Sequence, residues 1–190
     1  KYPFYPRGQS TPVIPRADIE IDFDVENDDV VYLFGAYITR KQPDGSYDKG
    51  EYVSFHFFNR DDPKEEGRQL AAFWAWLHQQ FEEAAANGKT ANVYCYSGKI
   101  AELPRMREAS IRNADVQGVP TPEEINELGA AAHWVDLYEI SKPLLWPTRR
   151  TGLKDVAKLA GFSWDASDAG GGNSIVWYQT ACGLIPGDAV

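Results

Sequence analysis

The sequence predicts an α/β domain built on a mixed β-sheet, in which three antiparallel strands are followed by parallel strands and helices flank the sheet. Three observations support this class. A segment at 17–26 alternates apolar and acidic residues, two more strand-like runs follow it closely, and a long segment of helical periodicity then leads to another short apolar run. A strand joined to a later strand through a helix is usually laid parallel to it by a right-handed crossover, so the sheet should be mixed.

The first predicted strand has two chemically different faces. Its apolar face is made by every second residue: Ile19, Ile21, Phe23 and Val25. Its acidic face is made by the residues between them: Glu20, Asp22, Asp24 and Glu26. Alternation of this kind indicates a strand that buries one face and exposes the other.

Turn and capping residues delimit the later elements, because Asn, Asp and Gly favour turns and Asp or Thr can cap a helix. After the first strand we expect strands at 30–38 and 51–58, then a helix that is capped by Asp61 or Asp62 and ended by Asn87-Gly88, and a fourth strand at 91–96. A helix at about 100–112, a short helix opened by Thr121, and a short strand or helix start at 133–138 should follow. The last predicted elements are helices at 151–160 and 173–181, separated by a loop at 168–172.

Composition indicates a single globular domain. The 190 residues are 43% hydrophobic, which is enough for one substantial core. Residues 1–16 hold four prolines and are interpreted as an entry arm or linker, with the domain at 17–190. Cys95 and Cys182 lack metal-ligand spacing and are interpreted as reduced thiols. We expect a soluble cytoplasmic chain without membrane contact, excised from a longer protein whose other domains are its partners.

The acidic face of the first strand indicates a divalent metal site. Neighbouring like charges repel and Asp is a poor strand former, so four acidic residues in a row need solvent or cations between them. Two carboxylates two residues apart, such as Asp24 and Glu26, can share one Mg²⁺ or Mn²⁺ ion or bridge two. Asp22 competes with Asp24, because a shift of two residues exchanges them on the same face. The alternative is a solvated sheet face.

The order of elements and three motifs resemble the ribonuclease H-like fold of DEDD (DnaQ-like) exonucleases. Asp24-Val25-Glu26, followed by Val31-Tyr32-Leu33-Phe34-Gly35, resembles the Asp-x-Glu first motif and the strand after it. Ser97-Gly98-Lys99-Ile100-Ala101-Glu102-Leu103-Pro104 resembles the second motif, with Ser97 for the usual Asn and Glu102 for the usual Asp. Trp134-Val135-Asp136-Leu137-Tyr138 and Thr151-Gly152-Leu153-Lys154-Asp155-Val156-Ala157 resemble the predicted ribonuclease H-like domain of actinobacterial RecB-like nucleases.

The resemblance implies a metal-dependent 3′-5′ exonuclease that acts on DNA or RNA, with single-stranded ends as its partner. Asp24, Glu26 and Glu102 are the implied metal ligands and catalytic residues of a two-metal phosphodiester hydrolysis, with Asp24 as the bridging ligand. The family's last motif, a tyrosine or histidine shortly before a final aspartate, is not found after Tyr178, so the fourth ligand is expected beyond Val190.

Polar and basic residues near these motifs are candidates for contacts with a nucleic-acid strand. They are Ser97, Lys99 and Arg105 around the second motif, and Arg149, Arg150 and Lys154 near the later helices. For each basic residue the alternative is a solvated helix face. The net charge of −9 argues against a broad basic surface. A second class of function therefore stays open: a ribonuclease H-like module with a decayed metal site that binds nucleic acid or scaffolds neighbouring domains.

Overall fold

The computed structural model describes residues 4–7, 13–147, 152–163 and 171–186. Its main sheet has five strands. They are β2 (Ile19–Asn27), β3 (Val31–Arg40), β4 (Glu51–His56), β5 (Ala91–Cys95) and β6 (Trp134–Asp136). Their order across the sheet is β4-β3-β2-β5-β6. The pairs β2–β3 and β3–β4 are antiparallel, whereas β5 runs parallel to β2 and β6. The predicted mixed sheet is therefore confirmed.

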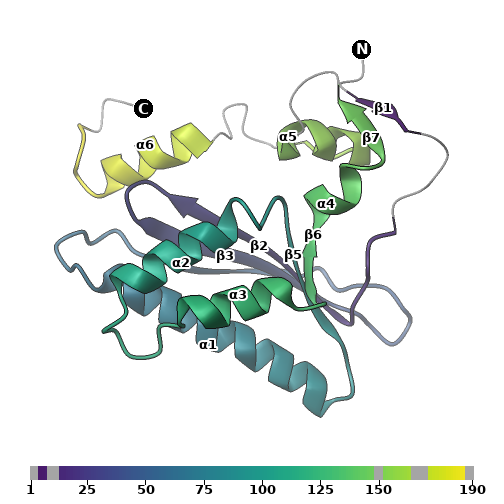
Figure 1. Ribbon diagram of the computed structural model, residues 1–190, viewed down its shortest axis with the longest axis horizontal. Coiled ribbons are helices and arrows are strands. Elements are labelled where there is room, and N and C mark those ends of the chain that lie inside the picture. Colours follow the sequence, from purple (N-terminus) through teal and green to yellow (C-terminus); the bar gives the residue numbers. More distant parts are fainter. Residues whose placement is uncertain (1–3, 8–12, 148–151, 164–170, 187–190) are drawn as a thin grey trace.

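Helices lie on both sides of this sheet (Figure 1). The helices below it in that view are α1 (Glu65–Ala86), α2 (Glu102–Arg112) and α3 (Pro122–Ala130). Those above it are α4 (Leu137–Ser141), α5 (Leu153–Val156), which continues into the 3₁₀ helix η1 (Ala157–Ala160), and α6 (Gly171–Ala181). No helix in the described ranges combines the length and apolar character that crossing a membrane requires.

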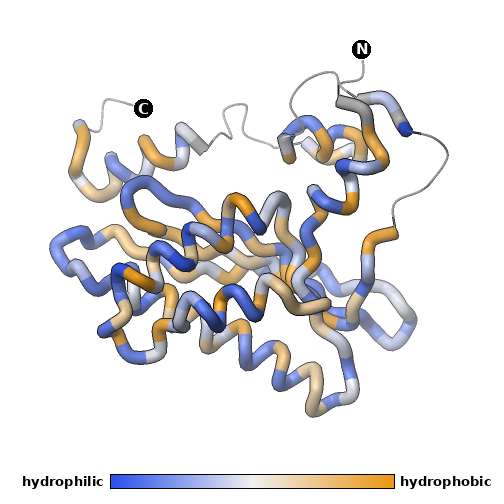
Figure 2. The backbone as a smooth tube through the Cα atoms, in the orientation of Figure 1, coloured by the Kyte–Doolittle hydropathy of each residue, from blue (hydrophilic) through white to orange (hydrophobic). Residues whose placement is uncertain are grey.

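β2 lies at the centre of the sheet and confirms the predicted alternation. Ile19, Ile21 and Phe23 are buried in the main core, which the residues of α1 and α2 complete. Phe23 stacks on Phe73 of α1, with ring centroids 4.6 Å apart. Orange and blue stretches alternate along the tube in Figure 2, as expected where elements bury one side. The acidic residues of β2 consequently lie on the face of the strand that does not pack on α1.

The start of α1 differs from the sequence prediction. Neither Asp61 nor Asp62 is the cap, because the N-cap residue is Lys64 and its side chain makes no capping hydrogen bond. The Asp62 carboxylate instead accepts a hydrogen bond from the backbone N–H of Lys64 at 2.9 Å. Because the Asp62 carboxylate accepts this hydrogen bond within a local turn, it does not cap the helix. Pro63 therefore lies before the helix, and Glu65 is its first residue.

Glu66 ties three elements together beneath the sheet. Its side chain is buried, and it accepts a hydrogen bond from the backbone N–H of Val31 at 2.7 Å. The guanidinium of Arg112 donates to both of its oxygens, at 2.6 and 3.1 Å, and the amide of Asn113 donates at 2.8 Å. A buried carboxylate needs partners of this kind. The network fixes the end of α2 against α1 and the start of β3.

Boundaries in the middle of the chain are sharper than the sequence predicts. The helix expected from about residue 100 begins at Glu102, which is the first residue of α2. The capping box of α3 is confirmed, since the Thr121 hydroxyl accepts from the Glu124 N–H and the Glu124 carboxylate accepts from the Thr121 N–H. The segment 133–138 contains both expected alternatives in succession, β6 and then the start of α4.

The last two predicted helices are also corrected. The helix expected at 151–160 divides into α5 and η1, and Gly161 in the left-handed conformation ends it, with φ of 77°. α6 begins at Gly171, so Gly171 and Gly172 are helical instead of forming the end of a loop. Thr151 and residues 168–170 lie outside the described ranges.

A small second sheet was not predicted. β1 (Phe4–Pro6) pairs antiparallel with β7 (Leu145–Pro147), and the Arg7 N–H donates to the Leu144 carbonyl at 2.8 Å. Strands of three residues are too short for alternation to reveal, and both end in proline, which suits a strand end. The segment interpreted as an arm therefore also contributes a strand.

α6 is held against the β2–β3 hairpin by side-chain contacts. Tyr178 stacks on Tyr32, with ring centroids 3.9 Å apart. The Ser174 and Tyr32 hydroxyls are hydrogen-bonded at 2.9 Å, and the Gln179 amide donates to Asp28 at 2.6 Å. These contacts place the helix beside the end of β2 that carries the acidic residues.

Candidate active site

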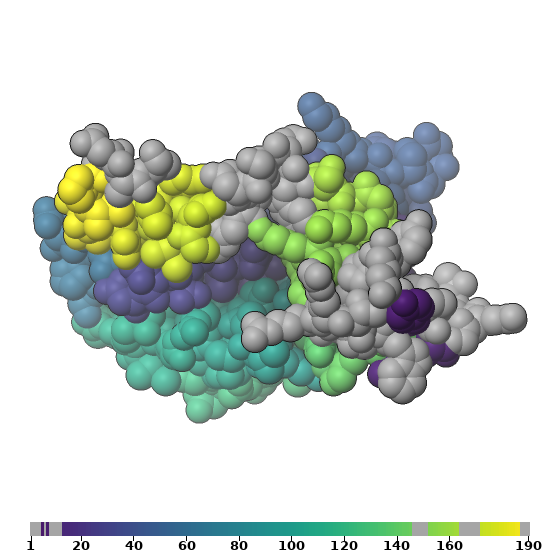
Figure 3. Space-filling model, turned by 90° about the horizontal axis from the view of Figure 1, so that it is seen from above, coloured from purple at the N-terminus to yellow at the C-terminus, as the bar shows by residue number. Residues whose placement is uncertain are grey.

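The acidic row of β2 forms one wall of a cavity of about 400 Å³. Asp22, Asp24 and Glu26 line it from β2, and Glu102 lines it from the start of α2. The other walls come from Phe23, Leu33, Gly35, Tyr37, Tyr52, Tyr94, Cys95, Tyr96, Leu137 and Leu153. Seen from above, the β2–β3 hairpin in purple is visible beside α6 in yellow (Figure 3). The fold therefore brings the four predicted metal-ligand residues to one cavity.

Glu102 reaches the cavity because of the turn between β5 and α2. Ser97 adopts a positive φ of 67°, which is uncommon for a residue other than glycine. Its backbone N–H donates to the Asp136 carboxylate at 2.9 Å, which holds the turn in this conformation. At Gly98 a Cβ atom would collide with the Cys95 sulfur. The tight turn delivers Glu102 beside β2, where the side chain is buried.

Asp24 and Glu102 form a carboxyl pair, in which the Glu102 side chain is buried and the Asp24 side chain is exposed to the cavity. Burial, with the charges of Asp24 and Asp136 adding to it, raises the pKa of Glu102 to about 7. Burial also raises the pKa of Asp24, although the Val25 N–H donates to its carboxylate at 2.9 Å. When Glu102 is ionised, its Oε2 atom is buried with no donor among the described residues. A protonated Glu102 can donate to Asp24, so the pair has a place for one proton or one cation.

Glu26 and Asp22 flank this pair along β2. Burial first, and the charge of Asp24 second, raises the pKa of Glu26, while the Ser174 hydroxyl and the charge of Lys154 oppose the shift. Burial also raises the pKa of Asp22. The Asp22 side chain is accessible to solvent, but the walls of the cavity limit its hydration. Glu102 lies against Asp24 and not against Asp22. The geometry thus favours Asp24 as the partner of the second motif.

Glu20, the remaining acidic residue of the row, has a structural role. Arg16 donates two hydrogen bonds to its carboxylate, at 2.6 and 2.9 Å. The hydroxyls of Tyr47 and Tyr94 lie 3.2 Å from the same carboxylate. Glu20 does not line the cavity, and its contacts fix the segment before β2 to the sheet.

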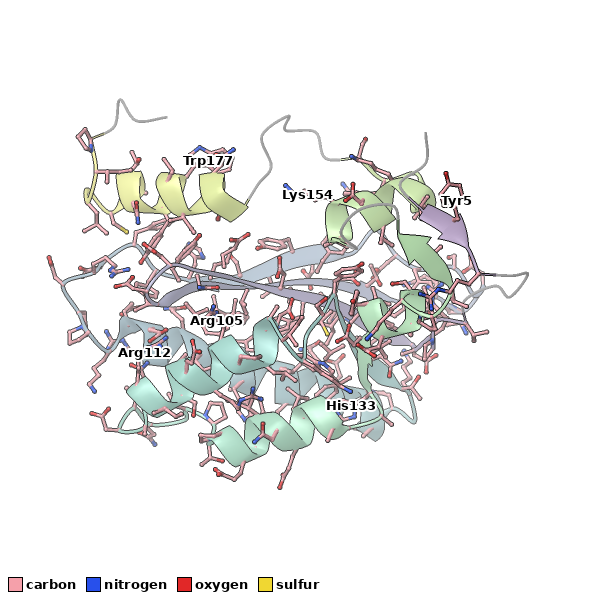
Figure 4. The ribbon with its side chains drawn as sticks, turned by 45° about the horizontal axis from the view of Figure 1, so that its top comes forward. Tyr5, Arg105, Arg112, His133, Lys154 and Trp177 are labelled. Carbon is pink, nitrogen blue, oxygen red and sulfur yellow. The ribbon has the colours of Figure 1, made fainter. Side chains whose placement is uncertain are left out.

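Lys154 is a predicted nucleic-acid contact whose charge acts on one of the carboxyl groups. Its positive charge opposes the rise in the pKa of Glu26, and the preceding residue, Leu153, lines the cavity. In Figure 4 the Lys154 side chain extends from α5 into the space towards α6. Trp177, labelled in the same view, lies on the side of α6 that faces away from the sheet.

The other predicted contacts lie outside the cavity walls. Arg105 is paired with Glu108 of its own helix at 2.8 Å. Neither Ser97 nor Lys99 is among the lining residues, and the Ser97 N–H is already bound by Asp136. Arg149 and Arg150 fall outside the described ranges. Contacts between nucleic acid and Ser97, Lys99 or Arg105 stay predictions.

Sequence reasoning missed two residues that shape this site. Tyr52 of β4 lies over Gly35 of β3, and the β2–β3 register places Gly35 directly opposite Asp24. The sequence pattern of β4 shows that Tyr52, Ser54 and His56 share one face of the strand. Nothing in the sequence indicates the strand register that brings this face beside Asp24.

The donor set fits a hard divalent cation. Carboxylate oxygens are the ligands that Mg²⁺ and Mn²⁺ prefer, and the buried Oε2 of Glu102 faces no donor among the described residues. Within the described ranges, no group of three or more His, Cys, Asp or Glu side chains is placed so that it could hold a metal ion by itself. Mg²⁺ is commonly bound through one or two carboxylates together with waters and substrate phosphates. The Asp24–Glu102 pair provides that number, and Glu26 lies one alternation further along β2.

Comparison with known proteins gives one family match. The family model RNase_H_2, described as RNase_H superfamily, matches residues 17–180. No curated protein matches the chain. The matched region contains the whole five-stranded sheet and every carboxyl group of the cavity. The chain therefore belongs to the RNase H superfamily.

Proposed function

We propose that the chain is a divalent-metal-dependent nuclease domain that hydrolyses phosphodiester bonds of DNA or RNA as a 3′-5′ exonuclease. The observation that carries this proposal is the Asp24–Glu102 pair, which combines the first and second motifs in one cavity and has a buried oxygen without a donor. Membership in the RNase H superfamily supports a nuclease-like, nucleic-acid-related function. The substrate class, single-stranded ends, follows from the DEDD resemblance and is part of the proposal.

Asp24, Glu26 and Glu102 are the residues that would hold Mg²⁺ or Mn²⁺. When bound there, the ion supplies an activated water and stabilises negative charge on the phosphate. The carboxyl pair must give up the proton that Glu102 holds below a pH of about 7, so metal affinity should rise as this proton is lost. Lys154 contributes a positive charge at the opening, which favours entry of a phosphate past the acidic row.

The direct test compares the wild type with Asp24→Asn, which retains the size of the side chain and removes one ligand charge. Calorimetric titration with Mn²⁺ should show binding to the wild type and none to the variant. A 5′-labelled single strand should shorten from its 3′ end only with the wild type and Mn²⁺. Glu20→Gln is the matched control, because Glu20 lies on the same strand but outside the cavity, and it should behave as the wild type. A wild type that neither binds Mn²⁺ nor shortens the strand contradicts the proposal.

A non-catalytic module that binds nucleic acid or scaffolds neighbouring domains is the second candidate. Its scaffolding role is favoured by the net charge of −9 and by the internal pairing of Arg105 with Glu108 and of Arg112 with Glu66. Retention of a labelled strand in EDTA, with no shortening when Mn²⁺ is added, would support this function. Partner domains in a longer protein and a cytoplasmic location are compatible with both candidates and remain predictions.

A further inference from the structure

The edge strand β4 places a tyrosine on the same face of the sheet as the acidic row. Tyr52 is directly opposite Tyr37 of β3, which is itself directly opposite Asp22 of β2. Residues opposite one another in adjacent strands point to the same face. Tyr52 therefore shares the cavity with Asp22 and Asp24, and it is one of the lining residues.

The Tyr52 side chain leans over Gly35, in the row that contains Asp24. A Cβ atom on Gly35 would lie 2.5 Å from the Tyr52 hydroxyl oxygen and 3.3 Å from the ring carbon that carries it. Any other residue at position 35 would therefore push the hydroxyl away. Glycine weakens the interior of a strand, so it is best explained there by a close approach of this kind. The absence of a side chain at position 35 creates the place for this hydroxyl.

Packing and internal hydrogen bonding leave the position of Tyr52 unexplained. The residue is 61% exposed, so its burial adds little to the core. The other three tyrosines of the cavity have partners: the Tyr37 hydroxyl donates to the Lys49 carbonyl, the Tyr94 hydroxyl donates to the Pro15 carbonyl, and Tyr96 is hydrogen-bonded to Ser141. In the described part of the chain, the Tyr52 hydroxyl has no such partner.

The Tyr52 hydroxyl is a donor at neutral pH, because the ordinary pKa of a tyrosine is about 10 and the proton stays on the oxygen. A phosphodiester that enters this cavity meets mainly acceptors, because Asp22, Asp24, Glu26 and Glu102 all carry carboxyl groups. A neutral hydroxyl supplies a donor for the phosphate without neutralising the carboxylates that would bind the metal ion.

We propose that Tyr52 is a substrate-contact residue whose hydroxyl donates a hydrogen bond to a non-bridging oxygen of the phosphate held beside Asp24, and that Gly35 provides the space for it. This inference rests on the proposed nuclease function and adds a residue of β4 to its site. The contact involves no covalent change, since Tyr52 keeps its proton throughout.

The test uses two variants that remove the contact by different routes. Tyr52→Phe deletes the hydroxyl and keeps the ring, whereas Gly35→Ala keeps the hydroxyl and displaces it. Tyr47→Phe is the matched control, because Tyr47 lies outside the cavity and its hydroxyl donates to the Ala17 carbonyl. For each protein, kcat and KM are measured on a labelled single strand with Mn²⁺, Mn²⁺ affinity by calorimetry, and Tm by thermal unfolding.

We expect kcat/KM to fall by roughly 10- to 100-fold in Tyr52→Phe and in Gly35→Ala, as for loss of a hydrogen bond to a charged group. Mn²⁺ affinity and the Tm of Tyr52→Phe should stay at the wild-type values, and Tyr47→Phe should cleave normally. Equal kcat/KM in the wild type and Tyr52→Phe overturns the role of Tyr52 and leaves the nuclease function intact. Loss of Mn²⁺ binding in Tyr52→Phe overturns it as well. A wild type that does not cleave overturns both proposals together.

Discussion

The carboxylate of Asp136 accepts a hydrogen bond from the backbone N–H of Ser97 at 2.9 Å, across the gap between the end of β6 and the turn that follows β5. The same oxygen accepts from the N–H of Tyr138 at 3.0 Å and so begins α4. A single buried side chain therefore fixes both the turn that leads to Glu102 and the helix that follows β6.

Removing this carboxylate should destabilise the domain. Asp136→Ala leaves the Ser97 and Tyr138 N–H groups without their partner, and the free energy of unfolding should fall by about 1–3 kcal/mol. Urea unfolding followed by circular dichroism measures the change. Asp136→Asn keeps a carbonyl oxygen as acceptor and should lose less. Equal losses in the two variants would show that the hydrogen bonds are not the cause.

Gly98 should be intolerant of a side chain because of Cys95. Gly98→Ala places a methyl group against the Cys95 sulfur, and overpacking of this kind costs about 1–3 kcal/mol. Cys95→Ala in the same chain removes the sulfur and should restore part of that loss, although the Trp134 indole nitrogen still lies 3.1 Å from the new methyl position. A double-mutant cycle from urea unfolding measures the coupling. Simple additivity of the two single losses would contradict the steric explanation.

The stability of the metal-free protein should fall as pH rises, because of Glu102. Its pKa is about 7 in the folded protein and 4.5 for the free side chain. Folding therefore favours the protonated form. This contribution is complete below a pH of about 4.5 and is lost as pH rises to about 7, with a change on the order of 3 kcal/mol at most. Urea unfolding in EDTA should show a shallower decline between these pH values for Glu102→Gln, and identical profiles would refute the assignment.

Glu66 should be among the most sensitive positions outside the cavity. Glu66→Ala leaves Asn113 and the exposed Arg112 without their acceptor, and we expect a loss of about 1–3 kcal/mol, as for a buried polar group that loses its partner. The neighbouring Glu65→Ala removes an exposed contact to Arg68 and should cost less than about 1 kcal/mol. Thermal unfolding of both variants makes the comparison. Similar Tm values for the two would mean that the buried network adds little.

The two thiols should differ in reactivity. Cys95 is buried, and its surroundings raise its pKa to about 12, so almost no thiolate is present at pH 8. Cys182 is free and only half-buried. A colorimetric thiol reagent should therefore modify Cys182 in the native protein and reach Cys95 only after denaturation. Rapid modification of both thiols in the native state would show that the turn around Gly98 opens readily.

Patterns in the sequence were enough to predict the mixed sheet and to identify three carboxylates, those of Asp24, Glu26 and Glu102. Apolar and acidic residues alternate along β2 because one face of the strand is buried. This alternation was enough to assign Asp24 and Glu26 correctly to the same face. Glu102 was identified through the family motif, and the structure places it against Asp24. β1 and β7 were missed because three residues carry no measurable periodicity.

Contacts between distant strands could not be predicted from the sequence. The proximity of Tyr52 to Asp24 depends on the β3–β4 register, and a shift of one residue would turn Tyr52 to the opposite face. Glu20 looked equivalent to the other acidic residues of β2. Its contacts come from Arg16, Tyr47 and Tyr94, and only the folded chain brings these side chains to it.

The central position of β2 has a consequence for how the site can open. β2 is hydrogen-bonded to β3 from Ile19 to Asn27 and to β5 from Ile19 to Asp22, so the amide protons of its first half can exchange with solvent only when a ladder breaks. α6 is held on the hairpin mainly by side-chain contacts such as those of Ser174, Tyr178 and Gln179, and it should exchange at a lower opening free energy. The doubly paired part of β2, which ends at Asp22, should therefore exchange more slowly than α6, and a helix that can detach first lies next to the carboxyl groups.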